Sequence, residues 1–233
     1  MKCEKTITTG FQSLDRVLFG GFHSGSLNVI AARTGVGKTI FSLQCAAGMA
    51  KNSGKEICFF SMLTAPDYVM WKLADLCRQG NVIHDDTAIK LSQIRTRLAG
   101  ISDLGAVIID SFEQILPEDG AHAQNVADAN EIARELKMIS RELDVPVICT
   151  CYLPRSQEKR LNCRPVLRDF DRISGGLVQD SDVILSLYRP VYYDTEEIED
   201  PTEAEVIVVK NCYGECDILP FRFGKIPQFS EDM

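Results

Sequence analysis

The sequence predicts an α/β fold in which a mainly parallel sheet is flanked by helices and ends in an antiparallel hairpin. Apolar runs typical of buried strands alternate with helical segments along most of the 233 residues. A glycine-bearing turn joins one apolar run to a helix, and two strand-like runs near the C-terminus are separated by turn residues. We expect a single domain over residues 1–233, because a chain of this length can bury one large core.

Five apolar runs predict the parallel strands, at residues 27–32, 57–61, 106–110, 145–151 and 183–188. Residues 40–49 predict a helix after the first run, and residues 127–143, with apolar positions near helical spacing, predict a helix that covers one sheet face. Residues 204–210 and 216–223 predict the hairpin, since Asn211, Tyr213 and Gly214 lie between them.

Composition limits the classes of partner. Lys and Arg number 25 against 33 Asp and Glu, which gives a net charge of −8, so any contact with nucleic acid must be local. The N-terminal residues lack the apolar stretch of a signal peptide, and no run approaches the roughly 18 apolar residues of a membrane span. Nine cysteines without paired-motif spacing fit a reducing compartment. We therefore expect a cytoplasmic protein with no membrane partner.

The turn after residues 27–32 has the pattern of a phosphate-binding loop. It comprises Arg33, Thr34, Gly35, Val36, Gly37, Lys38 and Thr39. Backbone N–H groups of such a loop form a cluster of donors for phosphate oxygens, Lys38 reaches the β- and γ-phosphates, and Thr39 ligates Mg²⁺. The strict pattern has Gly where this chain has Ala32, so the match is to a relaxed form. The alternative is an ordinary strand-turn-helix joint.

Asp110 ends the apolar run of residues 106–110. A carboxylate at the carboxyl end of a buried strand would hold Mg²⁺ beside Thr39, as in a Walker B strand. The alternative is an Asp that only caps the following segment.

Together, these motifs resemble a known family. The matching segments are residues 9–15, 20–22, 31–33, 37–39, 59–61, 109–110, 144–148, 164–165, 179–182 and 188–189. From residue 7 to about residue 229, the chain resembles the RecA-like motor domain of DnaB-type replicative helicases, which are P-loop NTPases. The resemblance implies ATP and Mg²⁺ as cofactors. It also implies a homo-oligomer, a hexameric ring that hydrolyses ATP between subunits and takes single-stranded DNA through its centre.

Three positions depart from the family pattern in parts that carry out hydrolysis. Leu63 stands where the resemblance places the water-orienting Glu, and loss of a general base typically costs about 10²–10⁴ in rate. Tyr152 replaces the sensor Gln, and Cys212 replaces the trans-acting Arg, worth about 10³–10⁵, while Lys210 of the same motif remains. These replacements predict weak hydrolysis at an intact phosphate loop.

Two carboxylates could substitute for the missing base. Thr64 and Asp67, with Pro66 between them, form a capping-box pattern that needs no catalytic explanation, so we favour a helix cap there. Glu113, three residues after Asp110, could approach the γ-phosphate, although an exposed Glu at a helix start is the ordinary alternative.

The resemblance maps DNA contacts onto two loops. The second is basic and contributes the candidates Arg155, Lys159, Arg160, Arg164, Arg172, Ser174 and Gly175, of which Arg172 is the best single contact. The first, residues 117–120, is acidic and unfavourable for phosphate. No aromatic residues interleave the basic cluster as stacking platforms, so a solvated loop remains the alternative.

Two functions follow. The first is a DnaB-like helicase ATPase domain that acts in DNA replication or translocation with weakened hydrolysis. The second is an ATP-binding paralogue that does not hydrolyse ATP and acts as a nucleotide-gated binding or assembly protein. The resemblance favours the first, and the departures favour the second.

Overall fold

The computed structural model describes residues 5–76, 81–87, 90–118, 126–155, 160, 162–170, 175–193 and 200–232. The strands are β1 (Thr6–Ile7), β2 (Phe22–His23), β3 (Leu27–Ala32), β4 (Glu56–Ser61), β5 (Val82–Asp85), β6 (Leu104–Asp110), β7 (Val147–Tyr152), β8 (Val183–Tyr188), β9 (Glu203–Asn211), β10 (Ile218–Phe223) and β11 (Phe229–Glu231). The helices are α1 (Gln12–Val17), α2 (Lys38–Ser53), α3 (Pro66–Leu76), α4 (Leu91–Leu98), α5 (Val126–Leu143) and α6 (Gly175–Asp180), with short helical turns η1 (Phe112–Gln114), η3 (Leu167–Asp169) and η4 (Pro190–Tyr192).

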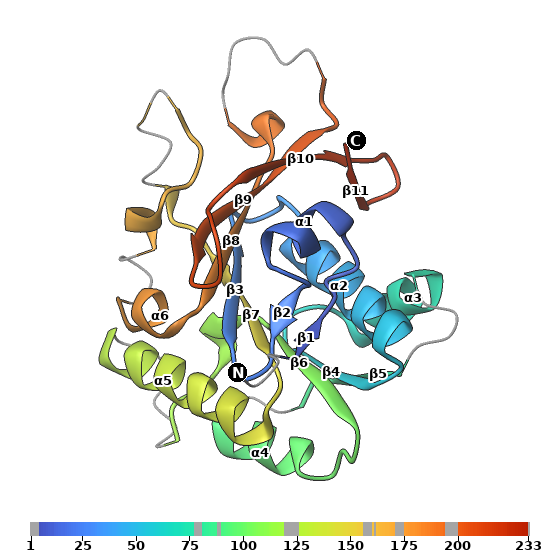
Figure 1. The fold of residues 1–233 in the computed structure, drawn as a ribbon, viewed down its shortest axis with the longest axis vertical. Helices are drawn as coiled ribbons and strands as arrows, with labels where there is room; N and C mark the ends of the chain where they lie inside the picture. Colours follow the sequence, from blue (N-terminus) through green and yellow to red (C-terminus); the bar gives the residue numbers. More distant parts are fainter. Residues whose placement is uncertain are drawn as a thin grey trace.

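A nine-stranded sheet in the order β11-β10-β9-β8-β3-β7-β6-β4-β5 forms the centre of the fold (Figure 1). Neighbouring strands from β8 to β5 in this order run parallel. Strands β9, β10 and β11 continue the sheet antiparallel from β8. The sheet confirms the predicted α/β class, the mainly parallel strands and the antiparallel C-terminal hairpin.

Several predicted boundaries differ from the observed ones by one to four residues, and for two strand starts the structure shows the cause. Strand β7 begins at Val147, because the N–H of Val145 donates to the Ser140 carbonyl at the end of α5 and Pro146 has no N–H to give the sheet. Strand β10 begins at Ile218 and not at residue 216, because the side chain of Asn211 bonds the backbone of Tyr213 and Glu215 and widens the turn. Strands β1, β2, β5 and β11 and helices α1, α4 and α6 were not predicted, since each is short. The helix cap favoured at Thr64 predicted a start for α3 but not its extent.

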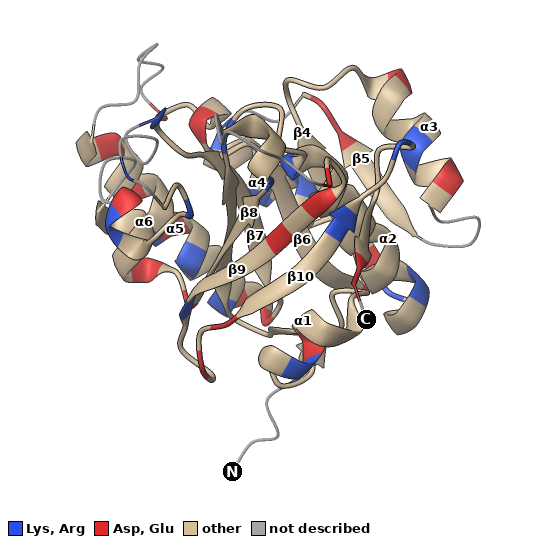
Figure 2. Ribbon diagram, turned by 90° about the horizontal axis from the view of Figure 1, so that it is seen from above, with Lys and Arg blue, Asp and Glu red and all other residues tan. Residues whose placement is uncertain are grey.

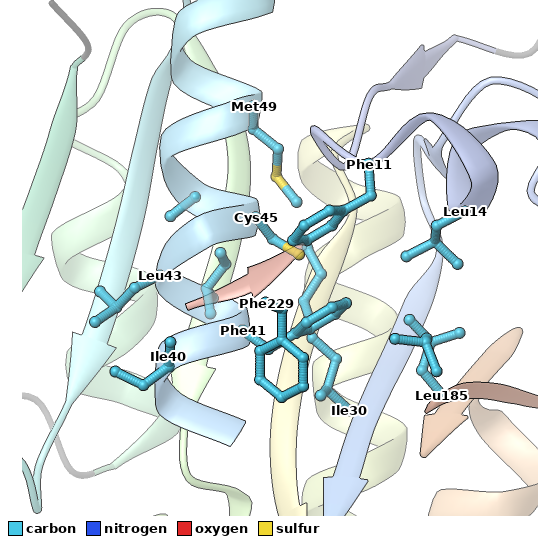
Figure 3. Close-up of a cluster of buried hydrophobic side chains, with 14 of the residues drawn as sticks. Phe11, Leu14, Ile30, Ile40, Phe41, Leu43, Cys45, Met49, Leu185 and Phe229 are labelled. Carbon is cyan, nitrogen blue, oxygen red and sulfur yellow. The ribbon is translucent and has the colours of Figure 1, made fainter. Parts of the chain in front are cut away.

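Both faces of the sheet are covered. Helices α1, α2 and α3 lie on one side, and α4 and α5 lie on the other (Figure 1). Side chains of α2 fill the first core, where Phe41 stacks on Phe11 at 4.9 Å between ring centroids and meets Phe229 edge-on at 5.3 Å (Figure 3). Helix α5 fills the second core through Ile132, Leu136 and neighbouring apolar residues. Burial of these opposed faces stabilises the sheet between them.

The carboxyl ends of β3, β4, β6 and β7 meet at one edge of the sheet, because these strands run parallel. Polar residues therefore gather there, as ligand sites do in open α/β sheets. No helix in the described part of the chain is long and apolar enough to cross a membrane.

Candidate functional site

The predicted phosphate loop joins β3 to α2. Strand β3 ends at Ala32 and helix α2 begins at Lys38, so the loop backbone opens onto the helix N-terminus. Gly35 and Gly37 have φ angles of 85° and 120°, a region that side-chain-bearing residues rarely adopt. These two glycines give the loop its concave shape.

Aromatic rings from the C-terminal part of the chain pack against the same glycines. A Cβ on Gly35 would lie 3.0 Å from Cε1 of Tyr192 in η4, and a Cβ on Gly37 would lie 3.0 Å from Cε2 of Phe229 in β11. Phe223 of β10 would lie 3.2 Å from that second Cβ. The loop is therefore supported from behind by elements that are distant in the sequence.

Thr39 and Asp110 meet at the mouth of the loop. The Thr39 hydroxyl donates to Oδ2 of Asp110 at 2.8 Å, and the hydroxyl of Thr150 in β7 donates to Oδ1 at 2.5 Å. Asp110 is buried, so its carboxylate is fixed by both hydroxyls. The structure thus brings together the two residues expected to hold Mg²⁺.

Lys38 is buried and points back over the loop. Its Nζ donates to the carbonyl oxygens of Ala32 at 3.1 Å and Arg33 at 3.3 Å, and it lies 4.0 Å from the centroid of the Tyr152 ring. Burial lowers the pKa of Lys38, while the nearby Cys151, Glu113 and Asp110 oppose that shift. The site therefore holds a cation among acidic neighbours.

Glu113 is not an exposed residue at a helix start. It lies in η1, and its Oε1 accepts the backbone N–H of Tyr152 at 2.5 Å. Oε2 is buried without a well-formed hydrogen bond. Burial raises the pKa of Glu113. Hydrogen bonds to its carboxylate, including the one from the Tyr152 N–H, and the charge of Lys38 oppose this shift. The expectation of exposure was wrong because β7 lies directly beside η1.

A cavity of about 180 Å³ opens in front of these groups. Its lining comprises Thr34, Gly35, Gly37, Lys38, Thr39, Ile40, Leu63, Thr64, Asp110 and Tyr152. Leu63, the position at which the family resemblance predicts a base, is 56% exposed and lines this cavity. Glu113 is not among the described residues that line it. Helix α3 begins at Pro66, and the N–H groups of Tyr68 and Val69 bond to Ala65, so Ala65 and not Thr64 precedes the helix.

This donor set fits a phosphate group with Mg²⁺. A backbone cradle with two glycines lies next to an ammonium group, and a hydroxyl–carboxylate pair supplies the hard oxygen ligands that Mg²⁺ prefers. The backbone cradle requires glycine at positions 35 and 37, since a Cβ at either position would crowd an aromatic ring.

Two arginines hold the loop to η4. Arg33 donates from Nη1 to the Tyr192 carbonyl at 3.0 Å. Arg189 is buried between the rings of Tyr192 and Phe223, and its Nη1 lies 3.5 Å from the Val36 carbonyl. Burial lowers the pKa of Arg189. No role was predicted for Arg189, because no local pattern relates it to Val36, 153 residues earlier.

Lys210 lies far from the phosphate loop of its own chain. It pairs with Ile184 at the start of β8, at the sheet edge opposite the loop. Its Nζ donates to the carbonyls of Ser181 at 2.6 Å and Val178 at 2.8 Å, beyond and within the last turn of α6. Within one chain, Lys210 neutralises a helix C-terminus.

The candidate DNA residues fall into three groups. Arg160 pairs with the buried Asp169, and Arg164 forms two hydrogen bonds to Glu205, at 2.6 and 2.5 Å. Arg155 is exposed, and Gly175 is the first residue of α6. Lys159, Arg172 and Ser174 lie outside the described residues. Basic and acidic positions are interspersed along the described ribbon (Figure 2).

Known proteins resemble this chain over most of its length. A profile of the DnaB-like helicase C terminal domain matches residues 6–75 and 66–231. The replicative DNA helicase DnaC of Bacillus subtilis (strain 168) is 32% identical over 253 residues, which cover 94% of this chain and 55% of that helicase. The replicative DNA helicase DnaB of Geobacillus stearothermophilus is 31% identical with the same coverage. The chain spans about half the length of these relatives.

Solved structures agree with the sequence matches. A DnaB-like replicative helicase, described with its interactions with primase, has a TM-score of 0.86 and 27% identity over 100% of this chain and 65% of its own. A second solved structure, of an ATPase domain, has a TM-score of 0.84 and 28% identity over 98% of this chain and 92% of its own. A KaiC-like protein of Pyrococcus horikoshii OT3, at 19% identity and a TM-score of 0.70, shares the fold. These likenesses confirm the predicted RecA-like fold.

Proposed function

Because the chain belongs to the family of DnaB-like helicase C-terminal domains, we propose that it binds ATP with Mg²⁺ at its phosphate loop and hydrolyses ATP slowly. The observation that carries this proposal is the 2.8 Å hydrogen bond from Thr39 to Asp110. It joins the end of the loop to the end of β6, and so it pairs the two oxygen groups that a metal ion beside the loop requires.

Different residues of this chain would bind the phosphate groups and the metal ion. Backbone N–H groups of residues 33–39 hold phosphate oxygens, aided by the N-terminus of α2. Lys38 neutralises phosphate charge, and Thr39 with Asp110 orients the metal. Bound ATP·Mg²⁺ supplies the transferable phosphoryl group and the charge that activates it. Arg33 and Arg189 keep the loop in place through η4.

Slow hydrolysis is proposed from the residues around the cavity. Leu63 lines it and cannot accept a proton. Glu113 lies behind the backbone of Tyr152, so a water molecule in the cavity would not meet its carboxylate directly. Losing a positioned base costs about 10²–10⁴ in rate. Glu113 and Lys210 remain candidates for a residual catalytic role, Lys210 in a neighbouring subunit's site.

Action on DNA is proposed from the family and depends on assembly. The relatives named above are replicative helicases, which favours a role in DNA replication or translocation. The intrachain pairs of Arg160 and Arg164 reduce the charge that one subunit offers to phosphate. We therefore propose that single-stranded DNA binds to a homo-oligomeric ring. The alternative is a nucleotide-gated binding or assembly protein.

Because two cores flank one sheet, we also propose that residues 1–233 form a single domain.

The decisive experiment combines turnover with assembly. Steady-state ATPase activity is measured with and without single-stranded DNA, and mass in solution is measured with and without nucleotide. DNA-stimulated turnover by a ring would support the helicase domain. Saturable ATP binding without turnover would support the binding protein. Absence of nucleotide binding would contradict both.

A further inference from the structure

The ammonium group of Lys38 is already enclosed by its own chain. An ammonium has three N–H donors. Two carbonyl oxygens, of Ala32 at 3.1 Å and Arg33 at 3.3 Å, accept hydrogen bonds from it. The ring of Tyr152 covers it from a third direction, with the centroid 4.0 Å from Nζ. This is close contact between a buried cation and an aromatic face. A phosphate oxygen that needs Lys38 must compete with the ring.

The backbone that carries this ring is fixed on both sides. Tyr152 pairs with Ala32 in the ladder between β7 and β3, and its N–H donates to Glu113 at 2.5 Å. The next N–H, of Leu153, donates to the Ala32 carbonyl at 3.0 Å. Because these bonds hold the main chain, the ring can leave Lys38 only by rotating its side chain. The hydrogen bonds of its backbone thus hold Tyr152 beside the phosphate loop, and its side-chain torsions determine whether the ring covers Lys38.

The phosphates of a nucleotide differ in how much they need Lys38. Loop N–H groups cradle the α- and β-phosphates, and the lysine reaches the β- and γ-phosphates. The β-phosphate therefore keeps its loop contacts without Lys38, whereas the γ-phosphate depends on the lysine and the metal. The cavity that Tyr152 lines has about 180 Å³, below the about 300–1,000 Å³ of usual small-molecule pockets. A ring that covers the Lys38 ammonium therefore disfavours the third phosphate more than the first two.

We propose that Tyr152 determines nucleotide specificity by covering the ammonium of Lys38, so that the site favours a nucleoside diphosphate over a triphosphate. The inference rests on the proposed nucleotide site and extends it. Tyr152 acts through Lys38 and is a positioning residue. The face of the ring supplies the effect, so phenylalanine preserves it and alanine abolishes it. A triphosphate binds fully once the ring has rotated away.

The test compares two ligands on four proteins. ADP·Mg²⁺ and the Mg²⁺ complex of a non-hydrolysable β,γ-imido ATP analogue are titrated by calorimetry into the wild type, Tyr152→Ala, Tyr152→Phe and Tyr68→Ala. Tyr68 lies on the surface of α3, outside the cavity lining, and serves as the matched tyrosine control. We expect the wild type to bind ADP more tightly. Tyr152→Ala should tighten the triphosphate by about 2- to 30-fold relative to ADP, the range for a lysine on an aromatic ring.

Tyr152→Phe and Tyr68→Ala should keep the wild-type ratio of the two affinities. The inference would be overturned if Tyr152→Ala left the ratio of the ADP and triphosphate affinities unchanged, or if it weakened triphosphate binding. In either case, ADP binding by the wild type would still support the proposed nucleotide site. Failure of both nucleotides to bind the wild type would overturn both proposals. If Tyr152→Ala does not fold, the wild-type ratio and Tyr152→Phe decide: a wild type without ADP preference, or a phenylalanine variant that loses it, refutes the inference.

Discussion

At the scale of single residues, Lys38 determines how strongly the proposed site attracts phosphate. It is buried, and burial lowers its pKa, yet Asp110 and Glu113 lie close enough to oppose that shift. Burial of a cation among acidic groups and carbonyl oxygens keeps its position fixed before a ligand arrives. A fixed charge of this kind loses little entropy on binding.

Lys38→Ala should weaken ATP·Mg²⁺ binding by about tenfold or more, because hydrogen bonds from a charged group are worth about 1.5–3 kcal/mol. A fluorescent nucleotide titrated into both proteins measures the change. Lys225→Ala, in the turn between β10 and β11, is the matched control and should bind like the wild type. Equal affinity of Lys38→Ala and the wild type for the nucleotide would show that the phosphate loop is not the binding site.

Leu63→Glu combined with Cys212→Arg should raise ATP turnover more than either change alone. Leu63 lines the cavity and Cys212 is exposed, so both positions accept a charged side chain without burial. A base without a trans-acting cation leaves transition-state charge unstabilised, and such groups act non-additively. The gain should grow with protein concentration, because the cation acts between subunits. An unmodified protein that turns over at about 1 s⁻¹ or faster would refute the weak-hydrolysis proposal.

Glu113→Gln should stabilise the protein more near pH 8 than near pH 4. Burial raises the pKa of Glu113, so just above the ordinary value of 4.5 the folded state binds more protons than the unfolded chain. Stability of the wild type therefore falls as pH rises through the window between 4.5 and the folded value. Urea unfolding of both proteins at the two pH values measures the difference. The same gain at both pH values would contradict a raised pKa of Glu113 in the folded state.

At the scale of elements, the C-terminal strands support the phosphate loop. Phe229 of β11 touches Phe41 of α2 and Phe223 of β10, with centroids 5.3 and 4.9 Å apart. Both its backbone N–H and its carbonyl bond to the side chain of Gln44, each at 2.8 Å. The three-residue edge strand β11 is therefore fixed to α2, the helix that follows the phosphate loop.

Phe229→Ala should lower the free energy of unfolding by about 3–5 kcal/mol, the usual cost of removing a buried phenylalanine. It should also weaken nucleotide binding, because the ring backs Gly37. Ile226→Ala, at a side chain that is 69% exposed in the same segment, is the control and should change stability by less than about 0.5 kcal/mol. Chemical denaturation compares the three proteins. A small loss for Phe229→Ala would show that β11 does not support the loop.

At the scale of the whole molecule, the negative net charge opposes DNA binding by one subunit but does not prevent phosphate binding at the proposed nucleotide site. The net charge is −8, and two of the candidate basic residues are paired within the chain. The proposed nucleotide site does not depend on net charge, because local backbone N–H groups and one lysine would supply its positive potential. DNA has no comparable cradle on the described part of one subunit.

A monomer should therefore bind single-stranded DNA weakly, with a slope of log K against log salt no steeper than about −2, as for two or three phosphate contacts. Fluorescence anisotropy at several salt concentrations, on protein of confirmed mass, measures both quantities. Association should steepen the slope, since each subunit adds contacts. Nanomolar binding by a confirmed monomer at physiological salt would contradict the prediction.

The sequence by itself determined the α/β class, the hairpin and the phosphate loop. Strands β3 and β8 matched their predicted bounds, because a run of apolar residues between turn residues specifies a buried parallel strand locally. The residues of the loop and Asp110 were likewise found in short patterns whose spacing carries their chemistry. Short elements such as β5 and β11 carry too few apolar positions to be seen in this way.

Only the tertiary structure decided what surrounds these residues. The ordinary alternative for Glu113 was an exposed residue, but it is only partly exposed, and its carboxylate accepts a hydrogen bond from the backbone N–H of Tyr152 in β7. Arg189 is placed under the loop by the return of β8 beside β3, a contact between residues 153 positions apart. Burial, hydrogen-bond partners and the cation–ring contact at Lys38 arise from packing of distant segments. A linear pattern records spacing along the chain and not these distances through space.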